Sequence, residues 1–140
     1  MSVVRCQMSG EQEDDVSGAG KAGAIAFEDL EVFRRAYRLS LEVHRLSLGF
    51  PDIEQYALAD QVRSASKSIC ANLSEGFAKQ AYSKAEFRRY VTMALGSADE
   101  MRLWARYCLD LGYIDEPTWR RWRDQYQEIA KMLRGLHRKV

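Results

Sequence analysis

The sequence lacks most of the residues from which catalytic and metal sites are built. Only two of its 140 residues are histidine, and its three cysteines have no metal-site spacing. His44 follows Leu41 and His137 follows Arg134 at the i−3 position, so neither belongs to the Glu-x-x-His pair of a di-metal helical bundle. No glycine-rich phosphate loop occurs, and no serine or cysteine has a predictable histidine partner. We therefore predict no catalytic residues, no metal, no cofactor and no small-molecule substrate.

The sequence also lacks long apolar runs. No stretch approaches the roughly 18 residues that cross a bilayer, and the N-terminus has no signal-peptide core. The odd number of cysteines fits a reducing compartment. These features predict a cytoplasmic protein that makes no contact with a membrane.

One globular domain is expected. Hydrophobic residues make up 46% of the chain, enough for a core in a protein of this length. Residues 1–25 are rich in glycine, serine, alanine and acids and show no periodicity, which predicts a disordered tail. Residues 26–140 are predicted to form the domain.

Four segments have the three-four apolar spacing of helices, at about 27–48, 53–78, 83–111 and 115–140. Gly49 and Pro51 end the first, and Gly112 ends the third. We expect Asp52 to cap the second helix and Ser83 with Glu86 to cap the third. The fourth is expected to start near Asp115-Glu116-Pro117, because acids suit the positive end of a helix and proline is tolerated in its first turn. Because no strand-like alternation occurs and the connections are short, the predicted fold is all-α, an antiparallel up-down-up-down four-helix bundle.

The first predicted helix has two apolar stripes roughly 140° apart on a helical wheel, and the third has a second apolar flank. A monomeric bundle buries one stripe per helix and would leave the others exposed. We therefore expect a homo-oligomer closed into a ring by head-to-tail contacts. The interface residues expected are Val32, Leu39, Val43, Leu46, Met93 and Trp104.

The second predicted helix is built largely from small residues and carries a polar Asn72 on the stripe expected to be buried. With the helix that follows, it has a pattern that resembles the bacterial four-helix-bundle family named for intervening sequences in large-subunit ribosomal RNA genes. The resemblance covers residues 27–138. Its motifs are Gly49-Phe50-Pro51, Tyr56-Ala57-Leu58, Gln61-Val62-Arg63, Ser68-Ile69, Asn72, Glu75-Gly76, Phe87, Ala94, Gly96-Ser97, Glu100 and Leu111-Gly112-Tyr113.

The resemblance implies more than the fold. Family members are similar to the accessory protein of diversity-generating retroelements, which forms a five-membered ring and binds RNA and a reverse transcriptase. A pentamer and an association with nucleic acid are thus implied, and the number five comes from this resemblance alone. Cys70-Ala71 replaces a proline-containing step common in the family, which leaves the second helix less interrupted.

Six motif residues are predicted to be structural, although Asn72, Glu75 and Gly76 could instead form a binding site. We expect Asn72 and Glu75 to hydrogen-bond across helices. Arg63 could pair with Glu75 or Glu100, or form only a weak salt bridge at the rim. The full set is Arg63, Asn72, Glu75, Gly76, Gly96 and Glu100.

Arginines on the first and fourth predicted helices are the candidate binding surface. The net charge is only +1, but residues 1–20 carry −3, so the rest carries about +4. The candidates are Arg34, Arg35, Arg38, Arg45, Arg120 and Arg121. Such groups would contact phosphates without reading sequence. Two functions stay open: a non-enzymatic oligomeric adaptor that binds RNA or a nucleic-acid-processing protein, and a protein-binding scaffold with no nucleic acid.

Overall fold

Four long helices make up most of the structure, a computed structural model that describes residues 26–140. They are α2 (Glu31–Ser47), α3 (Leu58–Lys79), α4 (Lys84–Asp110) and α5 (Glu116–Lys139), with short 3-10 helices η2 (Phe27–Asp29) and η3 (Asp52–Glu54). Residues 26–140 contain no strand, which confirms the all-α fold. The predicted disordered tail lies outside the described residues.

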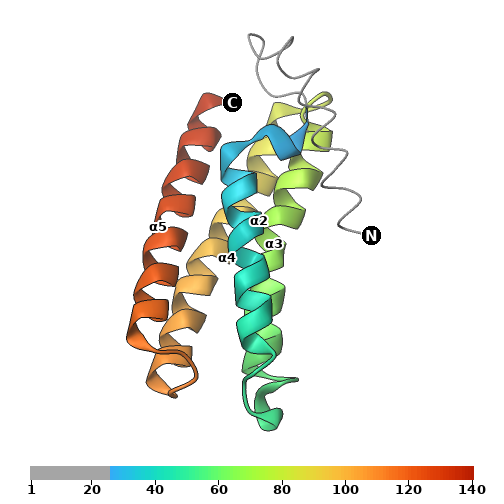
Figure 1. Ribbon diagram of the computed structural model, residues 1–140. Coiled ribbons are helices and arrows are strands. Elements are labelled where there is room, and N and C mark those ends of the chain that lie inside the picture. The colour runs from blue at the N-terminus through green and yellow to red at the C-terminus, as the bar shows by residue number, and fades with distance from the viewer. Residues whose placement is uncertain (1–25) are drawn as a thin grey trace.

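Helices that follow one another in the chain pack side by side (Figure 1). The α3–α4 contact is the most extensive, followed by α4–α5 and α2–α3, while α2 and α5 meet over a smaller area. This sequential packing agrees with the predicted up-down arrangement. At the C-terminus, an Arg88 Nη1 donates to the Val140 carbonyl at 2.7 Å and ties the end of α5 to the start of α4.

Local signals correctly predict two of the helix starts. The Ser83 hydroxyl accepts from the Glu86 N–H at 3.1 Å, and the Asp115 carboxylate accepts from the Thr118 N–H at 2.9 Å. Beyond the end of α4, Gly112 has φ of 83°, which glycine adopts without the steric cost that a side chain would add.

The other two starts were predicted too early. Leu30 has an extended backbone and separates η2 from α2. Ala57, whose backbone is not helical, lies between η3 and the start of α3. Asp52 therefore does not cap α3. Instead, a carboxylate oxygen of Glu54 accepts from the Leu58 N–H at 3.2 Å.

The core decides between the two apolar stripes of α2. Val32, Ala36, Leu39 and Val43 are buried within the single chain, whereas Phe33, Tyr37 and Leu41 of the other stripe are only half-buried. The assignment of Val32, Leu39 and Val43 to an interface between chains is therefore corrected: these side chains fill the bundle interior. The other three candidates, Leu46, Met93 and Trp104, remain partly exposed.

The contact between α3 and α4 depends on small residues. Gly76 is buried, and a Cβ added there would lie 2.7 Å from the Tyr90 Cβ and 3.3 Å from Phe87 Cδ1. Farther along the same contact, the Ser97 hydroxyl donates to the Ser68 hydroxyl at 3.0 Å. Gly76 thus lets the two helices approach more closely than any larger residue would.

We predict that Gly76→Ala lowers the free energy of unfolding by about 1–3 kcal/mol, because the added methyl group forces the helices apart. The matched control is Gly96→Ala on α4, where a Cβ meets nothing within 4 Å. Alanine is the better helix former, so this control should be neutral or stabilising by up to about 1 kcal/mol. Urea unfolding followed by circular dichroism measures both, and equal effects would contradict the packing argument.

Candidate nucleic-acid interface

Three of the candidate arginines lie on one side of α2. At about 100° per residue, Arg34, Arg38 and Arg45 fall within about 40° of one another. All three are exposed, and they face away from the core residues of the same helix. The amphipathic pattern of α2 therefore presents a row of guanidinium groups to solvent.

Two of the α2 arginines are held by nearby acceptors. Arg34 donates to a Glu31 carboxylate oxygen at 3.2 Å and to the Glu28 carbonyl at 3.0 Å, and Arg35 lies 3.7 Å from the other Glu31 oxygen. Exposed pairs of this kind contribute at most about 1 kcal/mol. A phosphate could therefore displace Glu31 at small cost.

The α5 arginines are more firmly engaged. Arg120 donates to the Glu116 carboxylate at 2.7 Å within its own helix. Arg121 donates to Glu42 of α2, and the Trp122 indole donates to the same carboxylate oxygen at 3.2 Å. Arg121 thus helps to hold α5 against α2, a structural role that the sequence did not reveal.

A shallow groove runs between α2 and α5 beside these residues. It is lined by Arg35, Arg38, Leu39, Glu42 and Gln125. Of the six candidate arginines, Arg38 and Arg45 have no ion-pair partner within residues 26–140, so they are the two most available to an anionic ligand. The structure brings Arg35 and Arg38 together at the groove, while Arg120 lies outside its lining.

Arg63 is structural, but its partners differ from those predicted. Its Nη1 donates to the Ser47 hydroxyl at 2.7 Å and to Gln55 Oε1 at 3.3 Å. Its Nη2 donates to the Gln55 carbonyl at 2.8 Å. Gln55 in turn donates to the carbonyls of Ser47 and Phe50. The expected pairing with Glu75 or Glu100 is wrong. A buried serine near the end of α2 was the available signal.

The side-chain amide of Asn72 donates its hydrogen bonds inside its own helix. Its amide donates to the Ser68 carbonyl at 2.9 Å and to the Ser68 hydroxyl at 3.0 Å. Ser68 then contacts Ser97 of α4. Asn72 therefore orients the serine that crosses the α3–α4 contact and does not cross it itself.

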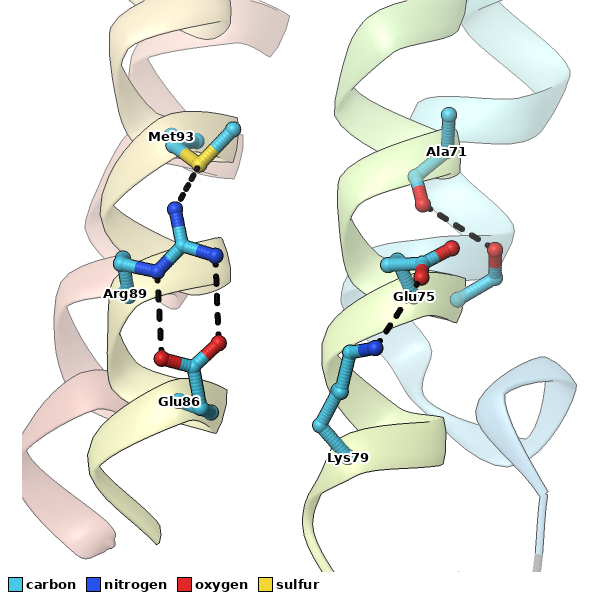
Figure 2. A network of polar contacts seen from close by, with 7 residues as sticks. Ala71, Glu75, Lys79, Glu86, Arg89 and Met93 are labelled. Carbon is cyan, nitrogen blue, oxygen red and sulfur yellow. Dashed lines mark hydrogen bonds and ion pairs between the residues drawn. The ribbon is translucent and has the colours of Figure 1, made fainter. Parts of the chain in front are cut away.

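Three motif residues lie at the surface. Glu75 is exposed and pairs with Lys79 at 3.5 Å along α3, as Figure 2 shows. Glu100 accepts from the Trp104 indole at 2.9 Å on α4. Gly96 is exposed with open space around it. The predicted cross-helix hydrogen bond of Glu75 is thus replaced by a contact within one helix.

The described cysteines are poorly suited to nucleophilic chemistry. Burial raises the pKa of the Cys70 and Cys108 thiols to about 12, so neither is a thiolate near neutral pH. Within residues 26–140, no three His, Cys, Asp or Glu side chains gather as a metal ion would require. None of the helices in this part of the chain is long and apolar enough to cross a membrane.

The family of the chain is given by its match to a known family model. The model of the 23S rRNA-intervening sequence protein family matches residues 28–135. The chain belongs to this family. The match spans all four helices but for the last turn of α5, so the whole bundle is the family's domain. No curated protein matches the chain.

A solved structure shows the same fold. It is a protein of unknown function from the S23 ribosomal protein family of Bacteroides thetaiotaomicron, with a TM-score of 0.68 and 22% sequence identity. The similarity covers 76% of this chain and 95% of that one. At this identity the likeness concerns the fold alone.

The contacts of Arg63 predict that replacing it destabilises the fold much more than replacing Glu75 does. Arg63→Met should lower the free energy of unfolding by about 1–3 kcal/mol, because Ser47 and Gln55 lose their partner. Glu75→Ala should change it by less than about 0.5 kcal/mol, since that side chain is exposed. Thermal and urea unfolding of both variants provide the measurement. A loss for Glu75→Ala as large as that for Arg63→Met would contradict these assignments.

Proposed function

We propose that this protein is a non-enzymatic, oligomeric adaptor that binds RNA or an RNA–protein partner. The observation that carries the proposal is the row of exposed arginines on α2, in which Arg38 and Arg45 lack an ion pair within the described residues. Guanidinium groups in a row suit the regular spacing of backbone phosphates. Membership in the 23S rRNA-intervening sequence protein family also supports RNA as the ligand.

The proposed binding would be weak for one chain. The face is diluted by Glu31 and Glu42, and the net charge of the whole chain is only +1. Several copies joined in one assembly would bind an RNA together and gain affinity through effective concentration. Oligomer formation is thus part of the proposal. The two cysteines in the described part of the chain, Cys70 and Cys108, are free, which suits a reducing compartment, and we propose that the adaptor is cytoplasmic.

The surface that supports self-association lies on α4. Met93, Leu103 and Tyr107 of α4, and Leu111 at its C-cap, are each between 42% and 52% exposed and follow a helical spacing on the side opposite the core. The Trp104 and Tyr107 rings lie 5.7 Å apart on the same side. Such a stripe is of the kind that monomeric proteins avoid exposing. The likeness to the ring-forming accessory protein supports five copies.

A protein-binding scaffold without nucleic acid is the second candidate. The same α4 stripe favours it, because an apolar surface with aromatic rings suits another protein as well as a second copy. The salt dependence of RNA binding separates the two functions. An adaptor must bind RNA with an affinity that falls as salt is added, whereas the scaffold binds no RNA at any salt concentration.

We predict that a structured RNA hairpin binds with an affinity that falls steeply as salt is added. Arg38→Glu with Arg45→Glu should weaken binding and reduce the slope of log affinity against log salt by roughly two, one for each lost phosphate contact. Gel-shift titrations at several salt concentrations measure this slope.

The matched control for that pair is Arg102→Glu with Arg106→Glu on α4, which changes the charge equally at two exposed arginines paired with Asp99 and Asp110. It should leave the slope nearly unchanged. Equal losses in both double variants would mean that only net charge matters and would refute the α2 face.

The α4 stripe predicts an assembly of five times the chain mass of 16.1 kDa, or about 80 kDa. Tyr107→Glu should dissociate it and leave the helical signal intact, because the ring is half-exposed. Val43→Glu, at a fully buried core position, should unfold the chain instead. Light scattering and circular dichroism distinguish the two results. A wild-type mass near 16.1 kDa would overturn the proposed assembly.

A further inference from the structure

The contact between α2 and α3 brings basic residues of the two helices to one level. The Ser47 hydroxyl and Arg63 Nη1 lie 2.7 Å apart and fix the register of this antiparallel pair. His44 lies one turn before Ser47 on α2, and Lys67 lies one turn after Arg63 on α3. One turn along each helix, in opposite chain directions, therefore places His44 at the level of Lys67.

Three cations act on the imidazole of His44. The charged groups that act on it are Lys67 and Arg63 on α3 and Arg45 on its own helix. Burial, and then these three positive charges, hold the pKa of His44 below its ordinary value of 6.5. Its Nδ1 is buried and has no hydrogen-bond partner in the described part of the chain. The folded protein thus disfavours the protonated imidazole of His44 and holds this ring near three positive charges.

Two of these cations are free to take a ligand. Arg63 is committed to Ser47 and Gln55. Arg45 and Lys67 are exposed, and neither has an ion-pair partner among residues 26–140. Arg45 also belongs to the arginine row on α2, so these residues extend that row around the helix onto α3.

We propose that His44, Arg45 and Lys67 form a phosphate-binding cluster across the α2–α3 contact, in which His44 takes up a proton as the oxyanion binds. The cluster rests on the proposed RNA-binding function when the phosphate belongs to an RNA backbone. Inorganic phosphate has the same oxyanion chemistry and is the other source.

The sign of the coupling follows from the charges. A bound oxyanion offsets Lys67 and Arg45 and favours the protonated imidazole, so it raises the pKa of His44. By linkage, the protonated protein binds the oxyanion more tightly. Affinity for a phosphodiester, whose own charge does not change near neutrality, therefore rises as the pH falls through the pKa of His44 in the complex. It levels off below the pKa of the free protein.

The two histidines of the chain make the test direct. The imidazole signals of His44 and His137 are followed by NMR against pH, in chloride, in inorganic phosphate at equal ionic strength, and with a structured RNA hairpin. His137 lies exposed near the end of α5 and reports any unspecific effect. We expect RNA and phosphate to raise the pKa of His44 and to leave that of His137 nearly unchanged.

Variants test the cluster itself. Lys67→Ala should remove most of the shift at His44 and lower the salt slope of RNA binding by roughly one. Lys84→Ala, at an exposed lysine near the start of α4, is the matched control and should change neither. His44→Gln should fold normally by circular dichroism and abolish the pH dependence of RNA affinity.

Each result distinguishes the phosphate-binding cluster from the proposed RNA-binding function. RNA binding that depends on salt but leaves the His44 pKa unchanged refutes the cluster and leaves the proposed function standing. A His44 shift in phosphate that Lys67→Ala removes, with no RNA binding, supports a free-phosphate site and refutes the adaptor. Equal shifts at His44 and His137, or a shift that survives Lys67→Ala, overturn the cluster.

Discussion

The close approach of α3 and α4 is the constraint on which the rest of the bundle depends. Gly76 leaves no room for a side chain against Tyr90 and Phe87, and Ser68 meets Ser97 farther along the same contact. Because α2 packs on α3 and α5 packs on α4, each outer helix takes its position from this central pair. The small residues that give the sequence its most recognisable segment therefore have a mechanical reason to be there.

A set of hydrogen bonds holds the C-terminal end of α2 against α3. Arg63 gathers the Ser47 hydroxyl and two oxygens of Gln55, and Gln55 holds two carbonyls of the turn. Glu54 of the same connection accepts from the Tyr113 hydroxyl at 2.7 Å, which links it to the turn between α4 and α5. The connection after α2 is thus held by charge-assisted hydrogen bonds, and it sets the register that places His44 at the level of Lys67.

The sequence predicts well what is determined locally. Helical periodicity locates the four helices, and it depends on residues within one or two turns. The cap at Ser83 and the acids beside Pro117 mark the starts of two of them. The breaks at Leu30 and Ala57 carry no glycine or proline signal and were missed. Which stripe of α2 faces the core depends on neighbouring helices, so Val43 was misplaced. Arg63 finds an uncharged partner sixteen residues away, which charge pairing could not suggest.

The hydrogen bond from Arg88 to the Val140 carbonyl has a consequence for the topology of the chain. It holds the end of α5 at the end of the bundle where α2 begins (Figure 1). A short linker from Val140 to Ala26 could therefore close the four helices into a loop, and the turn between α3 and α4, at the same end, could be opened in its place. In such a circular permutant the close-packed pair would become the first and last helices, joined only by side-chain contacts. Its folding would then report how far that contact assembles without the chain connection that now brings it together.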